Sequence, residues 1–324
     1  MMKAIRIQKT GGPEVIEFVD VEIPAPGPGQ IRIRQEAIGV NFIDTYHRSG
    51  LYPVSLPSGL GMEGAGVVEA VGAGVTRFKE GDRAGFCSGP IGAYAEAHVV
   101  EADRAVGLPT EMKFDIAAAS MLKGFTARFL LRKTFPVGRG HVVLIHAAAG
   151  GVGQIAVQWA KHLGATVIAT IGSDAKAEIA KKLGADHAIV TAGGTDIAAR
   201  VREITKGVGV DVVYDGVGKD TFEASLNSLK PRGMFVSFGN ASGAVPPFAP
   251  LLLTQKGSLF FTRPTMGHYT ATPEDLQETA DDLFGVIGQG AVKIETPQRY
   301  RLADAAQAHR DLEARKTTGS VVLF

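Results

Sequence analysis

The chain has 324 residues, of which 45% are hydrophobic, and its 34 Lys and Arg residues against 33 Asp and Glu leave a net charge of +1. This length allows two domains of typical size, each with a substantial core. The near-neutral charge excludes the broad basic surface that recruits nucleic acid or an anionic membrane. No apolar run reaches transmembrane length and the first residues lack the apolar region of a signal peptide, so we expect a cytoplasmic protein.

The first hundred residues alternate short strand-like segments with turns rich in glycine and proline. This spacing is typical of a compact, partly closed β-domain rather than of a helical one. The expected strands are residues 3–8, 16–21, 31–39, 64–71, 83–86 and 93–100. A helical pattern then takes over, with expected helices at 114–122 and 124–131.

Residues 141–164 read as a strand, a tight turn and a helix. An apolar run at 142–145 passes into small residues and glycines, and then into apolar positions at helical spacing. The turn matches the dinucleotide fingerprint GxGxxG at Ala148, Gly150 and Gly153, with the first glycine replaced. Gly150 would let the backbone approach a pyrophosphate, and Gly153 would let the helix pack closely on the strand.

Strand and helix alternate after this turn. The rhythm predicts a doubly wound parallel sheet with helices on both faces and a ligand crevice at the carboxyl ends of its strands. The expected strands are 141–146, 166–171, 187–190, 211–214, 233–238 and 258–262, and the expected helices are 152–163, 174–183, 195–205 and 219–228. The tail, with a helix at 273–289 and strands at 298–302 and 320–324, resembles the opening β-domain, so we expect the chain to cross back and complete it.

The end of the second expected strand indicates which nucleotide binds. An NAD site places an acidic residue there to hold the ribose hydroxyl groups, whereas here the strand ends in Gly172 and Ser173. Small uncharged residues leave room for a 2′-phosphate that Lys176 would neutralise, which favours NADP(H). The alternative is an ordinary helix start, with Ser173 as its N-cap and Asp174 and Lys176 as surface charges.

Several segments carry a family resemblance over essentially the whole chain. They are GVNFIDTYHRSGLYP at 39–53, SMLKGFTA at 120–127, AAAGGVG at 147–153, VYDGVG at 213–218 and VSFGN at 236–240. In these segments the chain resembles the zinc-independent, zeta-crystallin-like quinone oxidoreductases of the medium-chain dehydrogenase/reductase superfamily. The resemblance implies an NADPH:quinone reductase that acts as a homodimer paired through its Rossmann sheets.

The fold implied by this resemblance is α/β, with a Rossmann doubly wound parallel sheet and a GroES-like, mainly β catalytic domain. The catalytic domain would be discontinuous, formed by residues 1–122 and 263–324. The dinucleotide-binding domain would occupy residues 123–262.

The residue types at the superfamily's metal positions predict that this chain has no metal site. Where zinc members carry their first cysteine ligand the chain has Asn41, and where they carry Gly-His-Glu it has Met62 between Gly61 and Glu63. Neither an amide nor this thioether is a credible zinc ligand. The single cysteine, Cys87, excludes an intramolecular disulfide and a four-cysteine zinc lobe, and we expect it to be a small buried apolar residue.

The resemblance implies that Asn41, Tyr46 and Tyr52 are the catalytic residues. An amide and two phenols supply hydrogen-bond donors and flat surfaces that position a quinone without a metal. The alternative is that Asn41 forms a turn and the two tyrosines are half-buried packing residues. Lys123 either points into the same cleft or extends its ammonium group from the helix to solvent.

The resemblance also implies a set of residues in contact with the coenzyme NADPH. Relatives often carry a tyrosine that covers the adenosine phosphate, where this chain has Val190 to Gly194, so we expect a weaker preference for NADPH over NADH. The implied contacts are Asn41, Tyr46, Thr126, Gly150, Gly151, Val152, Gly153, Ser173, Lys176, Phe238, Gly239, Asn240, Thr262, Arg263 and Arg315.

Three functions remain open at this point. The first is NADPH-dependent quinone reduction, and the second is NADPH-dependent reduction of 2-alkenals or enones, which differs only in the acceptor pocket. The third is an NADPH-binding structural or nucleic-acid-binding protein with little turnover. The near-neutral charge and the absence of a basic stripe argue against nucleic acid.

Overall fold

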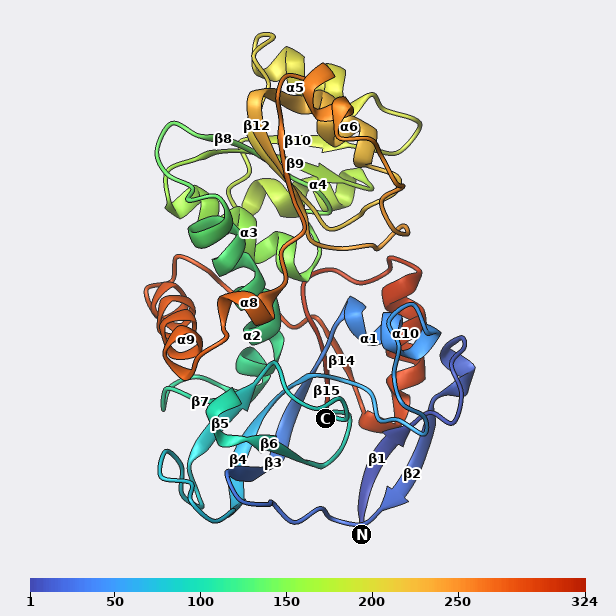
Figure 1. The fold of residues 1–324 in the computed structure, drawn as a ribbon, viewed down its shortest axis with the longest axis vertical. Helices are drawn as coiled ribbons and strands as arrows, with labels where there is room; N and C mark the ends of the chain where they lie inside the picture. Colours follow the sequence, from blue (N-terminus) through green and yellow to red (C-terminus); the bar gives the residue numbers. More distant parts are fainter. The chain divides into compact units, whose positions relative to one another are not determined.

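The computed structural model describes residues 1–324, which fold into two compact units (Figure 1). The first unit is built from separated segments, because the chain leaves it and returns twice. It comprises Met1–Phe125, Thr270–Phe284 and Ile294–Phe324, and the second unit comprises Thr126–Tyr269 and Gly285–Lys293. The domain boundaries implied by the family resemblance, near residues 122 and 263, stay a prediction.

The second unit is built on a six-stranded sheet in which all neighbouring strands are parallel. The strand order is β10-β9-β8-β11-β12-β13, so the direction of winding reverses between β8 and β11. Such a reversal opens a ligand crevice at the carboxyl ends of the strands. The predicted doubly wound parallel sheet is therefore confirmed. Its strands are β8 (Val142–Ile145), β9 (Thr166–Ile171), β10 (His187–Val190), β11 (Val210–Asp215), β12 (Leu229–Ser237) and β13 (Phe260–Thr262).

Helices cover this sheet because each presents an apolar stripe to the strands beside it. The helix α3 (Gly151–His162) packs against β8 and β9, α4 (Asp174–Lys182) against β9 and β10, and α6 (Phe222–Ser228) against β11 and β12. α5 (Ile197–Ile204) contacts β10 and α6, and two short helices follow, α7 (Leu251–Gln255) and α8 (Met266–Tyr269). An apolar core lies between them and includes Leu144, Ile168, Val213, Leu226 and Phe235.

The turn between β8 and α3 holds the strand and the helix at close approach. A Cβ atom at Gly153 would lie 2.5 Å from the carbonyl oxygen of Ala147 and 2.7 Å from Cα of Ala148. Ala147 itself has φ +51°, and the amide of Gly150 donates to its carbonyl oxygen at 2.9 Å. Only glycine fits at position 153, as the fingerprint predicts.

The first unit contains an antiparallel hairpin and a seven-stranded sheet. The long strand β3 is the centre of that sheet, because it pairs with β4, β6 and β15. β15 comes from the end of the chain, so both ends of the sequence contribute to one sheet. The strands are β1 (Met2–Arg6), β2 (Glu17–Val21), β3 (Gln30–Val40), β4 (Glu63–Val71), β5 (Arg83–Phe86), β6 (Ala97–Glu101), β7 (Ala105–Gly107), β14 (Gln298–Tyr300) and β15 (Val321–Leu323).

The helices of the first unit depart from the sequence expectation. The two helices expected at 114–122 and 124–131 are one helix, α2 (Phe114–Phe129), which continues into a π-helical turn at Leu130–Thr134. Gly124 does not break the helix but lets α9 (Pro273–Gly288) approach, since a Cβ there would lie 2.5 Å from Cδ1 of Leu283. The short 3-10 helices are Pro13–Val15, Ala102–Arg104 and Leu302–Asp304.

Two further helices, α1 (Phe42–Ser49) and α10 (Ala305–Glu313), were not expected from the sequence. The strand expected at 93–100 begins only at Ala97, because the preceding backbone is bound elsewhere. The amide of Ala93 donates to Gly61, and the side chain of Gln35 donates to the carbonyl oxygens of Ala93 and Ala95. No helix in the structure is long and apolar enough to cross a bilayer.

Replacement of Gly153 by alanine tests the close packing of α3 on β8. We expect Gly153→Ala to lower the free energy of unfolding by about 1–3 kcal/mol, because the added methyl group overlaps backbone atoms that have no room to move. Urea denaturation followed by circular dichroism measures this change. The control is Gly285→Ala in α9, where a Cβ would meet nothing within 4 Å and helix propensity favours alanine. Equal stability of the two variants would contradict the packing argument.

Candidate active site

Helix α1 brings together the three residues expected to be catalytic. Asn41 is the N-cap of α1, and the carboxylate of Asp44, three residues on, accepts the backbone amide of Asn41 at 2.8 Å. Tyr46 lies within the helix and is 9% exposed. The helix ends at Gly50 in the left-handed conformation, and the chain turns so that the ring of Tyr52 meets the ring of Tyr46 edge-on, with their centroids 5.2 Å apart. Asn41 is thus a helix cap, and the two phenols form one aromatic pair.

A fully buried carboxylate, that of Glu63 at the start of β4, lies beside Asn41. Its Oε2 accepts the side-chain amide of Asn41 at 2.8 Å and the ammonium of Lys123 at 3.2 Å. Its Oε1 accepts the backbone amide of Leu122 at 2.7 Å. Burial of an ionised carboxylate is costly unless it is paired and hydrogen-bonded, and here both conditions are met. We call Asn41, Glu63 and Lys123 the Glu63 cluster.

Gly39 makes room for this carboxylate. A Cβ at Gly39 would lie 2.2 Å from Oε2 of Glu63 and 2.3 Å from the carbonyl oxygen of Ala118. Any side chain at this position of β3 would displace either the carboxylate or helix α2. The role of Gly39 follows from packing alone, because its backbone is ordinary β-strand.

A second buried network connects α1 to α10. Arg48 forms a bidentate ion pair with Glu313 and donates to Nδ1 of His309 at 3.1 Å. Nδ1 therefore carries no proton, and the other ring nitrogen donates to the hydroxyl of Tyr94 at 3.1 Å. Tyr94 in turn donates to Oδ2 of Asp44 at 2.8 Å. Arg48 thus donates both to Glu313 and to His309, and from His309 the donation continues through Tyr94 to the carboxyl group of Asp44.

Burial sets the protonation of these groups. It raises the pKa of Asp44 from 3.8 to about 7, against the lowering effect of its hydrogen bonds from Asn41 and Tyr94. Burial, with the neighbouring Arg48, lowers the pKa of His309 to about 3, so its ring is neutral as the hydrogen bonds require. The other carboxylate oxygen of Asp44, Oδ1, is buried without a partner, which explains why its ionised form is disfavoured.

The residues with metal-binding side chains in the first unit do not converge. Nowhere in residues 1–324 do three or more His, Cys, Asp or Glu side chains form a group that would hold a metal ion. Cys87 is 1% exposed, and burial followed by the charge of Glu63 raises the pKa of its thiol. Cys87 is therefore the buried apolar residue that its isolation in the sequence predicts.

In the second unit, the start of α3 is a fit for a pyrophosphate. Its N-cap is Gly150, which has no side chain to occupy the amides of the first helical turn. The neighbouring helices differ: Ser173 caps α4 by accepting the amide of Lys176 at 3.4 Å, and Asp196 caps α5 by accepting that of Ala199 at 3.0 Å. Uncapped amides at the positive end of a helix dipole bind anions.

The ends of the strands near this helix carry the other expected coenzyme residues. The turn at Phe238–Asn240 after β12 packs tightly on the turn after β11, since a Cβ at Gly239 would lie 2.4 Å from the carbonyl oxygen of Gly216. The amide of Asn240 adopts the orientation in which its oxygen accepts Nη2 of Arg263 at 3.2 Å. Thr262, the last residue of β13, precedes that arginine.

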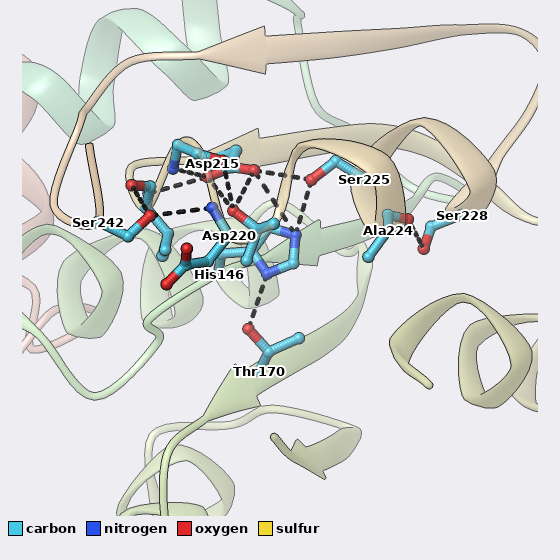
Figure 2. Close-up of polar contacts among 11 residues, drawn as sticks. His146, Thr170, Asp215, Asp220, Ala224, Ser225, Ser228 and Ser242 are labelled. Carbon is cyan, nitrogen blue, oxygen red and sulfur yellow. Dashed lines mark hydrogen bonds and ion pairs between the residues drawn. The ribbon is translucent and has the colours of Figure 1, made fainter. Parts of the chain in front are cut away.

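Figure 2 shows the polar network beneath this edge of the sheet. His146, which follows β8, contacts the hydroxyl of Thr170 through Nδ1 at 2.8 Å and that of Ser225 through Nε2 at 3.0 Å. Ser225 donates to Asp215 at 2.7 Å, so it must accept from His146, whose proton is then on Nε2. Asp215, at the end of β11, also accepts the hydroxyl of Thr221. The network joins the ends of β8, β9 and β11 where the sheet reverses.

The structure thus divides the residues expected from the sequence between its two units. The first holds Asn41, Tyr46, Tyr52 and Arg315, the last in a left-handed conformation after α10. The remaining expected residues belong to the second unit: Thr126, Gly150, Gly151, Val152, Gly153, Ser173, Lys176, Phe238, Gly239, Asn240, Thr262 and Arg263.

Sequence reasoning gave no role to Gly39, Asp44, His146 or Asp215. The capping pair Asn41 and Asp44, followed by a glycine at position 50, was a local signal for α1 that could have been read.

The two units match two described sequence families. Residues 27–110 match the "Alcohol dehydrogenase GroES-like domain" and residues 151–284 match the "Zinc-binding dehydrogenase" family. With the Rossmann strand order and the uncapped helix start, these matches define the class of protein, a medium-chain dehydrogenase/reductase.

Comparison with individual proteins shows which family of this superfamily the chain is most similar to. The chain is 54% identical to a quinone oxidoreductase of Pseudomonas aeruginosa over 325 residues, covering 100% of each chain. It is 46% identical to a 2-haloacrylate reductase of a Burkholderia species over 331 residues, covering 100% of this chain and 99% of that one. The crystal structure of Escherichia coli quinone oxidoreductase complexed with NADPH matches with a TM-score of 0.97 at 48% identity, covering 99% of each chain. The chain belongs to the quinone oxidoreductase family.

The pH dependence of stability tests the burial of Asp44. Because its pKa is raised from 3.8 to about 7, the folded state binds a proton that the unfolded chain releases, and this contribution to stability is lost as the pH rises from about 4 to about 7. Asp44→Asn keeps an oxygen acceptor but cannot ionise. We expect its free energy of unfolding, relative to the parent protein, to be higher at pH 8 than at pH 5.

Urea denaturation at the two pH values measures this difference. The matched control is Asp220→Asn, an exposed aspartate whose side chain makes no hydrogen bond in the structure. A difference between Asp44→Asn and the parent that is the same at pH 5 and pH 8 would show that Asp44 ionises normally.

Proposed function

We propose that this protein reduces quinones by hydride transfer from NADPH without a metal ion. The observation that carries the proposal is the uncapped helix start after β8 in a chain that is 54% identical, end to end, to a quinone oxidoreductase. Its coenzyme is NADPH, which is bound in the structures of the Escherichia coli quinone oxidoreductase and of a mycobacterial protein, each with a TM-score of 0.97. When bound, NADPH supplies the hydride. The chain's own residues hold the reactants in place and stabilise the negative charge that develops on the acceptor.

The second unit supplies the coenzyme site in this proposal. The first-turn amides of α3 at Gly151, Val152 and Gly153 hold the pyrophosphate, and the absence of a side chain at Gly150 keeps them open. Lys176 in the first turn of α4 neutralises the 2′-phosphate, and Ser173 faces it from the N-cap. The other residues assigned to the coenzyme are Asn41, Tyr46, Thr126, Phe238, Gly239, Asn240, Thr262, Arg263 and Arg315.

The first unit supplies the acceptor site. Tyr46 and Tyr52 present two aromatic surfaces in fixed edge-on contact, which suits a flat quinone ring. Asn41 is held by Glu63 and by the α1 cap, so its amide is preorganised as a donor to the acceptor oxygen. Quinones make a modest demand on such donors, because the charge that develops on reduction is delocalised over the ring.

A second candidate reaction is the reduction of a conjugated carbonyl compound. It is favoured by the 46% identity to a 2-haloacrylate reductase, whose named substrate also accepts a hydride on a carbon conjugated to a carboxyl group. Both reactions use the same coenzyme site and differ in the acceptor pocket. We place the quinone first because the more similar relatives are quinone oxidoreductases.

We further propose that the protein is a cytoplasmic homodimer paired through its Rossmann sheets. In support, β13 is an edge strand of the six-stranded sheet and carries Phe260, which is 58% exposed. An exposed aromatic residue on an open edge favours pairing with a second copy. Light scattering of the purified protein measures its mass, and a monomer would contradict the dimer.

A panel of acceptors tests the reaction. We expect NADPH oxidation with ortho- and para-quinones to give a higher kcat/KM than with 2-alkenals or 2-haloacrylate. A higher kcat/KM with the conjugated carbonyl compounds would favour the second reaction. Coenzyme binding without turnover on any acceptor would favour a structural role.

Removal of the Lys176 charge tests the basis of coenzyme choice. We expect Lys176→Ala to raise KM for NADPH about 10-fold or more while leaving KM for NADH nearly unchanged, since a charge-assisted contact to phosphate contributes about 1.5–3 kcal/mol. Lys182→Ala, an exposed lysine at the other end of α4, is the control. Equal changes in the two KM values would exclude Lys176 as the phosphate ligand.

A further inference from the structure

The ammonium group of Lys123 is buried with most of its hydrogen-bonding capacity unused. The residue is 5% exposed, and the only hydrogen bond of its Nζ is to Oε2 of Glu63 at 3.2 Å. An ammonium has three N–H donors, so two of them have no acceptor in the protein. Buried donors without partners are rare, and they indicate a place where a ligand or water completes the set.

The location of this ammonium indicates which ligand. Oε2 of Glu63 accepts both Nζ of Lys123 and Nδ2 of Asn41, so the two donors converge on one oxygen atom. Asn41 is the residue we assign to the acceptor oxygen, which places Lys123 at the same end of the acceptor site. Glu63 is fully buried, and its ion pair with the ammonium of Lys123 holds that group in position.

We infer that Lys123 is a catalytic residue that binds the reduced oxygen of the quinone and delivers its proton. This inference rests on the proposed quinone reduction. A quinone that accepts a hydride becomes a hydroquinone anion, with one oxygen bearing the negative charge. An N–H bond of Lys123 breaks, an O–H bond forms on that oxygen, and Lys123 is left as a neutral amine that regains a proton from water.

The charge balance of the cluster suits this step. Before reaction, the ammonium and the Glu63 carboxylate together are neutral, so a neutral quinone enters without an electrostatic penalty. As negative charge develops on the acceptor, the nearby ammonium attracts it in an environment of low dielectric constant, where the interaction is strong. After proton transfer the product is neutral again and no longer held by charge.

The test needs variants that keep the buried charges balanced. Lys123→Met alone would leave Glu63 as an unpaired buried carboxylate, so the principal variant is the double change Lys123→Met with Glu63→Gln. Lys123→Arg keeps the positive charge but cannot lose a proton at neutral pH. Lys113→Met, an exposed lysine just before α2, is the control for the substitution itself.

The first measurement is kcat/KM for a series of quinones whose hydroquinone anions differ in basicity. We expect the double variant to lose about 100-fold with the most basic anion and progressively less as the anion becomes less basic, because a weak base needs little help from an acid. The dissociation constant for NADPH should stay within about twofold of the parent. Lys123→Arg should show the same trend across the series with a smaller loss, because it keeps the positive charge but cannot deliver a proton. A loss that is equal for all quinones, no loss, or full activity in Lys123→Arg would overturn the proton-delivery step.

The second measurement does not depend on turnover. 4-Nitrophenolate resembles the hydroquinone anion that forms before proton transfer, and calorimetry in the presence of NADP⁺ measures its binding. We expect about 10-fold weaker binding to the double variant and unchanged binding to Lys123→Arg. Equal binding to the parent and the double variant would overturn the oxygen-binding role. If the parent reduced no quinone but bound nitrophenolate through Lys123, the proposed function would fail while the site would stand.

Discussion

The buried carboxylate of Glu63 is the interaction on which the arrangement of the first unit depends. It has no exposed surface, so protein groups must balance its charge entirely. These groups come from two places in the chain, Asn41 and the adjacent residues Leu122 and Lys123. Satisfying this one group therefore fixes the start of α1 against β4 and against the middle of α2. Since α1 carries Tyr46 and leads to Tyr52, the same contacts set the position of the two tyrosines that we propose for the acceptor site.

The second unit carries the site that we propose for the pyrophosphate of the coenzyme. The N-cap residue of α3, Gly150, has no side chain to accept the first-turn backbone amides. In α4 and α5 the N-cap side chain accepts one of these amides. The edge that surrounds them is held by the His146 and Asp215 network, which joins three strand ends through neutral and charge-assisted hydrogen bonds. Rigid strand ends keep the uncapped helix start in place without occupying it.

The sequence was sufficient for features that depend on local spacing. The strand, turn and helix around Gly153 were predicted because the fingerprint places a glycine where helix and strand must touch. The Glu63 cluster was not predicted, because its partners lie 22 and 60 residues away and no local pattern connects them. The split expected at Gly124 was wrong for the same reason: the glycine serves contact with Leu283, which only the folded chain brings near. Contacts between residues far apart in the sequence determine the roles of Glu63 and Gly124. The hydrophobic periodicity of a segment carries no information about such contacts.

We propose that protein donors, and no metal ion, balance the negative charge that develops on the quinone. The most direct test of this proposal is the metal content and the quinone reductase activity of the same sample after exhaustive treatment with a chelator. We expect less than about 0.1 metal ion per chain together with undiminished NADPH-dependent activity, because in this proposal Asn41 and Lys123 supply the hydrogen-bond donors to the charged oxygen. Activity that is lost with the chelator and regained with stoichiometric zinc would contradict it.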